Sequence, residues 1–555
     1  MDARSGQVVL RDAVIKHLNV TGTGATRYVG QRPIFADQFG GGYRLRETVH
    51  GKGVVTLNSR KGNSYAASVD FVDNDNNWSA AEYNNANFDN AALDAHVGAQ
   101  VTQDYWTTVH GRDSFDDKGT VLTSYVHYDD VPGGAGYENA FWNGSVMTYG
   151  DGATRFRPLT ALDVCGHEIG HAVCETTAGL VYANESGAMN EGFSDIWGAC
   201  VEYYLDPAKQ TWLIGEDIDK AQVALRSMSN PASLGQPDTY KGVNWAIGTA
   251  DNGGVHTNSG VLNFWFYLLS VGGTGTNDKG SVYNVAGITI AKAEKIAYRT
   301  ERVYLTPNAT YSNARQGSLQ AAVDLYGLGS AEVQAVARAW RAVGVEQTES
   351  APTISGFPAS GLVGQAVAIA GTNLGSTYRV RFNGTDAVAA TYTSLTGITV
   401  KVPAGATTGA ITLTTVTGSV TTGTSFTVLA PGPAPTISSF APAAGSAQGG
   451  AVTLTGTNFT GATAVSFNGT AAAFTVGNAT TISTTVPTGA GSGALIVTTP
   501  NGSASITFTV LPAITSFSPT GGLAGTAVTI IGTNLGAAVN VKFNGVYANS
   551  LNVVN

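Results

Sequence analysis

His167-Glu168-Ile169-Gly170-His171 is the stretch that decides how this chain is interpreted. On an α-helix, histidines at positions i and i+4 lie on one face, so both imidazoles can reach a single metal ion. Apolar residues recur every three or four positions from Leu162 to Thr176, which predicts such a helix, and Gly179 offers a stop. We therefore expect a metal-binding helix here.

Small residues stand beside the two histidines. Gly166 and Gly170 each cost a helix interior about 1 kcal/mol relative to alanine. A neighbouring element packed closely against the helix would account for them.

An acidic segment follows the histidine motif at Asn190-Glu191-Gly192-Phe193-Ser194-Asp195. Glu191 on a second helix would complete three protein ligands and leave a fourth position for water, which is typical of catalytic zinc. Asp195 and Asn190 are candidates to accept hydrogen bonds from the other ring nitrogens of the histidines. Glu168 lies next to the ligand face, where a general base could take a proton from that water.

Further motifs occur in a fixed order around these two segments. They are Asn139–Ser145 (NAFWNGS), Met147–Gly152 (MTYGDG), Ala178–Tyr182 (AGLVY), Asn184–Gly187 (NESG), Gly215–Ile218 (GEDI), Leu225–Ser229 (LRSMS) and Asp251–Gly260 (DNGGVHTNSG). Over about residues 20–345 the chain resembles the thermolysin family of secreted bacterial zinc metalloendopeptidases. The resemblance implies an α+β fold with a β-rich N-terminal lobe, a helical C-terminal lobe and a cleft between them.

The resemblance also implies roles for individual residues. It implies zinc binding by His167, His171 and Glu191, water activation by Glu168, oxyanion stabilisation by Tyr182 and His256 with Asp251 orienting the histidine, and substrate-backbone contacts by Asn139, Ala140 and Arg226. These donors suit amide hydrolysis, because negative charge develops on the carbonyl oxygen. A structural ion pair is the alternative role for Arg226.

Six apolar residues match the pocket that, in the family, receives the side chain after the cut bond. They are Phe156, Leu159, Val164, Ile214, Ile218 and Leu225. Without the resemblance they would be assigned to the hydrophobic core. If the match holds, cleavage should favour large apolar residues at that position.

Calcium is expected at two places. Asp73, Asp75 and Asn77 have the oxygen-ligand spacing of a loop site and match a family calcium loop, with an acidic turn as the alternative. Asp163, Glu202 and Glu216 match carboxylates of the family's paired calcium site. Thr211 and Leu213 stand where further acids are expected, so we predict one ion rather than two, or weak binding.

Bulk properties exclude several classes of protein. The 555 residues exceed one core, and the net charge of −9 gives no basic surface for nucleic acid. No run of eighteen apolar residues indicates a membrane span. The odd set Cys165, Cys174 and Cys200 is not a disulfide framework. We expect small buried side chains, with a Cys174–Cys200 bridge as the alternative.

The composition changes sharply near residues 346–352. Beyond Ala351 the charged residues are Arg379, Arg381, Asp386, Lys401 and Lys542. Three segments with a period of about 80 residues each carry Gly-Thr-Asn, at Gly371, Gly456 and Gly532, and Phe-Asn-Gly, at Phe382, Phe467 and Phe543. Short Val/Ile/Thr runs between turns predict antiparallel β-sandwiches, and the repeats resemble IPT/TIG immunoglobulin-like domains.

This organisation predicts the following division. We expect a propeptide tail over 1–19, a β-rich lobe over 20–160, a helical lobe over 161–346, a linker over 347–352 and repeats over 353–430, 434–511 and 512–555. The last repeat is about half a domain, so we expect the chain to be cut short there. No signal peptide is visible at Met1, and the segment 2–10 resembles the last hairpin of a family propeptide.

The leading hypothesis is a secreted zinc endopeptidase acting on proteins or peptides through an activated water. The alternative is an adhesion protein whose sandwich repeats bind a glycan, a protein or a surface. Casein hydrolysis distinguishes the two.

Overall fold

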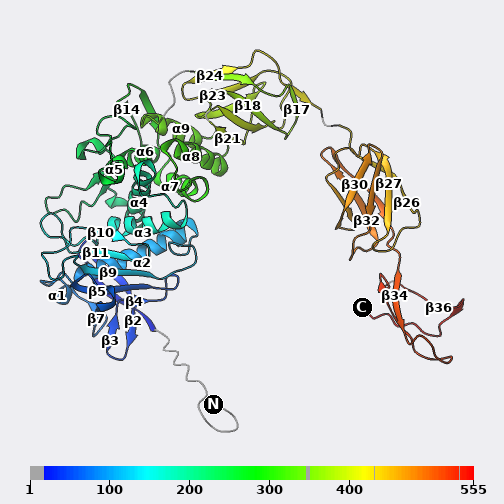
Figure 1. The fold of residues 1–555 in the computed structure, drawn as a ribbon, viewed down its shortest axis with the longest axis horizontal. Coiled ribbons are helices and arrows are strands. Elements are labelled where there is room, and N and C mark those ends of the chain that lie inside the picture. Colours follow the sequence, from blue (N-terminus) through cyan, green and yellow to red (C-terminus); the bar gives the residue numbers. More distant parts are fainter. Residues whose placement is uncertain (1–17, 346–350, 395, 431, 537, 555) are drawn as a thin grey trace, which may run out of the picture. The chain divides into compact units, whose positions relative to one another are not determined.

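The computed structural model describes residues 18–345, 351–394, 396–430, 432–536 and 538–554. It forms two compact units that divide between Val428 and Leu429 (Figure 1). The first unit holds a β-rich lobe, a helical lobe and one β-sandwich, and the second holds the remaining strands. The expected hairpin within 2–10 and most of the expected linker lie outside the described residues.

The N-terminal lobe is built on two β-sheets. The first has strand order β7-β3-β2-β1-β8 and the second β10-β11-β9-β5-β4, with β6 paired to β5. β10 therefore forms an edge of the second sheet. The strands are β1 (Leu18–Ala25), β2 (Gln31–Phe39), β3 (Gly42–Arg44), β4 (Arg46–Glu47), β5 (Val54–Gly62), β6 (Val69–Asp70), β7 (Val72–Asp73), β8 (Asn77–Trp78), β9 (Leu122–Tyr128), β10 (Ala140–Trp142) and β11 (Met147–Gly150).

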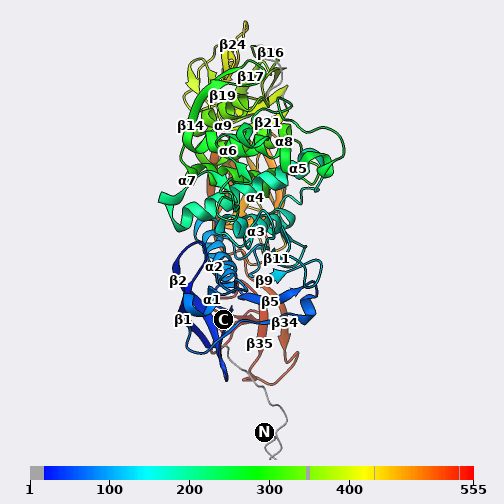
Figure 2. The same ribbon diagram turned by 90° about the vertical axis from the view of Figure 1, so that its left-hand side faces the viewer.

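Helix α2 (Asn90–His110) connects the two lobes. It contacts β5 and β9 of the second sheet and also α3, and Figures 1 and 2 both show it between the sheet strands and α3. It ends at Gly111, whose φ of 64° is the left-handed conformation that closes a helix without a Cβ clash. The short α1 (Ala80–Tyr83) precedes it.

The second lobe is helical, as predicted. Its helices are α3 (Leu162–Thr176), α4 (Asn184–Leu205), α5 (Asp251–Asn258), α6 (Gly260–Val271), α7 (Ile290–Arg299), α8 (Tyr311–Tyr326) and α9 (Ala331–Ala342), joined by the 3₁₀ turns η2 (Pro207–Lys209) and η3 (Pro231–Leu234) and by strands β12 (Leu213–Ile214), β13 (Arg226–Ser227), β14 (Gly272–Thr276) and β15 (Val282–Ala286). The expected metal-binding helix is α3, and Gly179 just beyond it has a φ of 61°.

Glycines allow α3 and α4 to lie in backbone contact. A Cβ on Gly166 would lie 3.0 Å from the Gly198 Cα, and one on Gly170 would lie 2.9 Å from the Ser194 Cα. Real Cβ atoms rarely come this close to a backbone atom, so larger residues would push the helices apart. The glycines beside the histidines thus admit a neighbouring helix, as the sequence suggested.

β-Sandwiches follow the helical lobe. In the first, sheets β16-β18-β22-β21 and β20-β19-β23-β24 form the two layers, and the second repeats this with β26-β27-β31-β30 and β29-β28-β32-β33. Strands β18 (Ala366–Thr372) and β27 (Ala451–Thr457) alternate exposed and buried residues along their length, which is the period-two pattern of a half-buried strand. The predicted α+β fold with sandwich repeats is confirmed.

The remaining strands after the helical lobe have the following bounds. They are β16 (Thr353–Gly356), β17 (Ser360–Leu362), β19 (Thr377–Phe382), β20 (Thr385–Asp386), β21 (Ala390–Ser394), β22 (Gly397–Lys401), β23 (Ile411–Thr415), β24 (Gly418–Thr421), β25 (Thr427–Leu429), β26 (Thr436–Ala441), β28 (Ala464–Phe467), β29 (Thr470–Ala472), β30 (Phe474–Asn478), β31 (Thr481–Thr485), β32 (Gly493–Thr499), β33 (Gly502–Phe508), β34 (Ala513–Ser518), β35 (Thr529–Thr533), β36 (Lys542–Phe543) and β37 (Val546–Tyr547). The last four form two small two-stranded sheets.

Two further expectations concern the described residues. Cys165, Cys174 and Cys200 are all buried free thiols, so the sulfurs of Cys174 and Cys200 are not joined. Within the part of the chain that the structure describes, no helix combines the length and the apolar character needed to cross a bilayer.

A buried ion-pair triad ties α2 to the second sheet. His127 in β9 places Nδ1 2.6 Å from Asp151 Oδ1 and Nε2 3.3 Å from Asp89 Oδ1. Burial favours the neutral imidazole, but the two carboxylates outweigh it and raise the pKa of His127 to about 9. The charged ring therefore cross-links the residue before α2 to the loop after β11.

We predict a pH-dependent contribution from this triad. Because the folded pKa of His127 lies above its ordinary 6.5, its stabilisation is complete below pH 6.5 and is lost as pH rises through about 9. His127→Gln should therefore lower the melting temperature strongly at pH 6 and much less at pH 10. Calorimetry at both pH values, with His110→Gln as a half-buried histidine outside the triad, measures the difference. An equal loss at both would contradict the charged state.

Candidate active site

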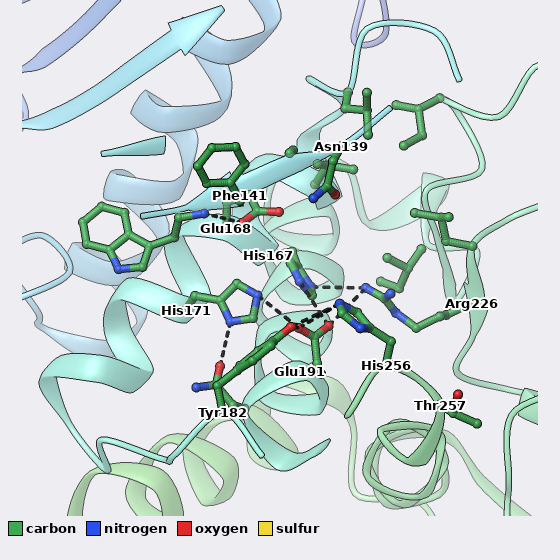
Figure 3. Close-up of a pocket in the computed structure, with 18 of the residues that line it drawn as sticks. Asn139, Phe141, His167, Glu168, His171, Tyr182, Glu191, Arg226, His256 and Thr257 are labelled. Atoms are coloured by element: carbon green, nitrogen blue, oxygen red, sulfur yellow. Dashed lines mark hydrogen bonds and ion pairs between the residues drawn. The ribbon is translucent and has the colours of Figure 1, made fainter. Parts of the chain in front are cut away.

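Helix α3 places its motif at the floor of a cleft of about 820 Å³ between the lobes. His167, Glu168 and His171 all line this cleft, together with Tyr182 and Glu191 (Figure 3). The two histidine rings lie edge to face with their centroids 4.6 Å apart. The helical spacing read from the sequence thus brings both imidazoles to one point.

Helix α4 adds Glu191 to the two histidines. Its Oε2 lies 3.6 Å from His167 Nε2, and its Oε1 lies 3.5 Å from His171 Nε2. Two ligands about 2 Å from one tetrahedral ion would stand roughly 3.4 Å apart, so these separations fit a zinc ion. Among the described residues, this is the group of His, Cys, Asp or Glu whose ligand atoms converge within 4.8 Å of one another.

The unsatisfied chemistry of Glu191 also fits a cation. Its Oε2 is buried and accepts no hydrogen bond within the described structure. Buried carboxylate oxygens are normally paired, so an unpaired oxygen beside two imidazoles fits a cation-binding site. Burial opposes ionisation, yet the nearby His171 and His167 lower the pKa of Glu191 to about 2. Glu191 is therefore a carboxylate at any working pH.

Neighbours on α4 orient the two imidazoles. His167 Nδ1 lies 2.8 Å from Asp195 Oδ1, and His171 Nδ1 lies 2.6 Å from Asn190 Oδ1. The hydrogen on each Nδ1 is thereby directed outward, which leaves each Nε2 lone pair facing Glu191. Ser194 Oγ is a further neighbour, 3.0 Å from His171 Nδ1. Asn190 and Asp195 occupy the supporting positions predicted for them.

Asp195 is itself held from three sides. Arg226 contacts it with two nitrogens, Nε at 2.7 Å from Oδ2 and Nη2 at 2.6 Å from Oδ1. Asn263 Nδ2 on α6 donates to Oδ2 at 2.7 Å. Although burial opposes the charge, Arg226 and His167 hold the pKa of Asp195 well below its ordinary value. Arg226 thus forms a bidentate ion pair and still lines the cleft.

Glu168 faces the cleft from the opposite side of the motif. The backbone N–H of Trp142 in β10 donates to its Oε2 at 2.9 Å, so the edge strand holds this carboxylate in place. Its other oxygen remains available to a water in the cleft. The side chain is buried, which limits its contact with bulk solvent.

Tyr182 and His256 meet on the far side of Glu191. Tyr182 Oη lies 3.1 Å from His256 Nε2 and donates to Glu191 Oε1. Burial and the neighbouring carboxylate raise the pKa of Tyr182 far above its ordinary value, so it remains a hydroxyl donor. Asp251 lies 2.6 Å from His256 Nδ1 and fixes the ring so that Nε2 points toward the cleft.

All predicted substrate-contact residues gather along the cleft. Asn139 and Ala140 lie at the start of the β10 edge. The six apolar residues form one wall, and each of them lines the cleft: Phe156, Leu159, Val164, Ile214, Ile218 and Leu225. Leu225 is half-buried and the other five are buried. They are thus core residues and pocket residues at once.

The Asp73 loop has the geometry of an Asx turn. Asp73 Oδ2 accepts the Asp75 N–H at 3.1 Å, and Asp75 Oδ1 accepts the Asn77 N–H at 2.9 Å. Asp73 is buried, whereas Asp75 and Asn77 are exposed. Asp73 ends β7, Asn77 begins β8 and Asp75 lies in the turn between them, while Asn77 Oδ1 accepts a hydrogen bond from Thr23 Oγ1 at 2.9 Å.

The second predicted cation cluster contains a residue that the sequence analysis missed. Asp163, Glu202 and Glu216 come together, and burial with mutual repulsion raises the pKa of both Asp163 and Glu202. Lys209 from η2 enters this cluster, with Nζ 3.4 Å from Glu202 Oε1 and 2.5 Å from Asp217 Oδ2. The Lys209 ammonium thus neutralises part of the negative charge of this carboxylate cluster.

Other supporting residues also escaped the sequence analysis. Ser194 lies inside the predicted acidic segment, so its place one turn after Glu191 was a usable signal. Asn263, Lys209 and the backbone N–H of Trp142 come from distant elements, and no spacing in the sequence relates them to the motif.

Comparison with known families agrees with this geometry. Residues 21–175 match the family model described as thermolysin metallopeptidase, catalytic domain, and residues 178–345 match thermolysin metallopeptidase, alpha-helical domain. Residues 435–510 and 512–555 match the IPT/TIG domain.

Individual relatives are similar over the same region. The chain is 43% identical over 352 residues to a bacillolysin of Brevibacillus brevis, covering 62% of this chain and 61% of that protein. It is 47% identical over 310 residues to the thermostable neutral protease NprT of Geobacillus stearothermophilus, covering 55% and 53%. Among solved structures, the precursor of protealysin from Serratia proteamaculans is 30% identical, covering 53% of this chain and 87% of that one, with a TM-score of 0.43.

These relatives extend beyond the matched region. The chain spans about half to three fifths of the length of the curated relatives it matches, between 53% and 61%. The two adjoining metallopeptidase models together account for residues 21–345 with a gap of two residues. The chain therefore belongs to the thermolysin family of metallopeptidases and carries IPT/TIG repeats after its metallopeptidase region.

Proposed function

We propose that this protein is a zinc-dependent endopeptidase that hydrolyses peptide bonds with water as the nucleophile. The observation that carries this proposal is the convergence of His167, His171 and Glu191, whose unpaired Oε2 lies 3.6 Å from His167 Nε2 and whose Oε1 lies 3.5 Å from His171 Nε2. His167, His171 and Glu191 would hold the zinc. A zinc ion held there supplies a Lewis acid for the peptide carbonyl and for the attacking water.

Glu168 acts as the general base. Its carboxylate faces the cleft beside His167, and the Trp142 N–H fixes its orientation. It takes a proton from the attacking water and can return that proton to the nitrogen of the leaving amine. No acyl-enzyme forms, because water attacks directly.

Tyr182 and His256 stabilise the charge that develops on the carbonyl oxygen. The hydroxyl and Nε2 lie 3.1 Å apart and both face the cleft, so they can converge on one oxygen. Because Asp251 holds His256 and Glu191 holds Tyr182 by hydrogen bonds before substrate binds, little reorganisation is needed during the reaction.

The substrate lies along β10 with one side chain in the apolar pocket. β10 is a sheet edge, and an extended peptide can pair with such an edge through its backbone, next to Asn139 and Ala140. The apolar wall then favours a large apolar residue after the cut bond. Arg226 reaches the cleft while paired with Asp195, so we assign it both the ion pair and a substrate contact.

The remaining assignments are also proposals. We propose that the protein acts outside the cell, that the domain division follows the boundaries predicted from sequence, and that the sandwich repeats serve as a spacer or bind a glycan, a protein or a surface. Calcium would bind Asp73, Asp75 and Asn77. One calcium rather than two would bind Asp163, Glu202 and Glu216, because Lys209 occupies part of that cluster.

Glu168→Gln tests the mechanism. We expect the variant to keep its zinc, because Glu168 is not a ligand, and to lose peptide hydrolysis by roughly 10²–10⁴-fold. Elemental analysis and casein hydrolysis measure the two effects, with the remote Glu332→Gln as control. Wild-type protein that carries zinc but hydrolyses no casein would overturn the endopeptidase proposal and favour the binding hypothesis.

Leu225→Ala tests the pocket. Removing this half-buried side chain widens the apolar wall, so we expect preference to shift from leucine toward larger aromatic residues after the cut bond, by roughly tenfold in the ratio of kcat/KM. A peptide library reads the ratio, and Leu325→Ala on α8 is the matched control. An unchanged profile would remove Leu225 from the pocket.

Lys209→Met tests whether the Lys209 ammonium stabilises the carboxylate cluster in place of a bound calcium ion. Without the ammonium, Glu202 and Asp217 lose their partner, so we expect a lower melting temperature in calcium-free buffer. Added calcium should then raise the melting temperature of the variant by more than it raises that of the wild type. Lys292→Met, which removes a surface ion pair with Glu332, is the control. Equal calcium responses would show that Lys209 does not compete with the ion.

A further inference from the structure

His256 stands on a segment with unfavourable backbone geometry. Asp251, Asn252, Gly253 and Gly254 have φ angles of 51°, 50°, 90° and 79° in succession. Asp251 and Asn252 are strained in this left-handed region, because their Cβ atoms approach the backbone there. The His256 side chain is 53% exposed, so packing alone does not hold it. Specific bonds must keep the ring in place.

Gln236 makes such a bond from another part of the chain. Its Nε2 donates to the His256 carbonyl oxygen at 2.6 Å and to Ser259 Oγ at 3.2 Å. Ser259 Oγ in turn donates to the same carbonyl at 3.0 Å. These three groups form a closed hydrogen-bonded triangle.

Gln236 is itself fixed by its surroundings. It is 5% exposed, it follows the turn η3, and its backbone N–H donates to the Pro231 carbonyl at 3.1 Å. Gly235 before it has a φ of 78°, which ends η3 in the left-handed conformation that glycine adopts without strain. The amide therefore approaches His256 from a rigid turn.

The environment of the Gln236 side-chain oxygen indicates why an amide occupies this position. Gln236 Oε1 is buried and has no hydrogen-bond partner in the described structure. An unpaired buried acceptor carries a desolvation cost that an apolar side chain of the same length would avoid. The contact that offsets this cost is the donation from Nε2 to His256.

We infer that Gln236 is a positioning residue that holds His256 for oxyanion stabilisation. Asp251 fixes the rotation of the imidazole through its contact with Nδ1. Gln236 fixes the position of the His256 backbone through its hydrogen bond to the carbonyl oxygen. The two restraints together keep His256 Nε2 beside Tyr182. This inference rests on the proposed peptidase function.

Gln236→Met removes the donor and keeps the length of the side chain. Asn258 still anchors the segment, because its side chain bonds both the N–H and the carbonyl of Ala246. We therefore expect a folded, zinc-containing protein with kcat reduced roughly tenfold and KM nearly unchanged, since the lost restraint acts on the transition state. Gln334→Met on α9 is the matched control.

A double-variant cycle separates positioning from general damage. If Gln236 acts through His256, then Gln236→Met should have no further effect on kcat in a His256→Ala background. Effects that multiply in the double variant would show a merely structural role and would overturn the inference.

Hydrogen exchange gives a readout that does not depend on activity. We expect Gln236→Met to increase amide exchange across residues 254–259 at least several-fold, and Gln334→Met to leave it unchanged. A wild-type protein without peptidase activity would contradict the proposed function alone. Unchanged exchange in Gln236→Met would overturn the positioning role whatever the activity.

Discussion

The backbone contact between α3 and α4 is the constraint on which the site depends. Because Gly166 and Gly170 face Gly198 and Ser194 without intervening side chains, α4 approaches closely enough for Glu191 to reach both imidazoles. The same approach brings Asn190 and Asp195 to the outer nitrogens of those rings. A single methyl group at this contact would have to displace a helix backbone, so the ligand geometry and the helix packing cannot vary independently.

Charge is arranged in layers around this contact. The two imidazoles surround Glu191, Asp195 lies behind His167, and Arg226 and Asn263 lie behind Asp195. Each buried charge therefore has an opposite charge or a hydrogen-bond donor next to it, which is what makes ionised groups tolerable in an interior. The arrangement also fixes the tautomers of the histidines. Their Nε2 atoms are free for a cation because the Nδ1 atoms are already engaged.

The remaining groups reach the cleft from four separate parts of the chain. Glu168 is held by the edge strand β10, Tyr182 precedes α4, His256 follows a left-handed turn, and Gln236 follows η3. Each is held by a hydrogen bond from an element remote in sequence. The acidic cluster around Asp163 is neutralised differently. There, the side chain of Lys209 supplies positive charge that a bound cation would otherwise supply.

Sequence patterns alone predicted helix α3 with its candidate metal ligands, the two residues on α4 beside them, the apolar residues along the cleft and the repeated sandwiches. Those features depend on periodicity, on motifs only a few residues long, or on motif order shared with a known family. Tertiary structure alone decided that Lys209 enters the acidic cluster, that Asn263 supports Asp195 and that Gln236 supports His256. These contacts join residues between 7 and 68 positions apart through the folding of intervening elements, as the Asn263–Asp195 separation of 68 shows. Side-chain partners of this kind have no fixed spacing, because they depend on where whole helices and turns come to lie.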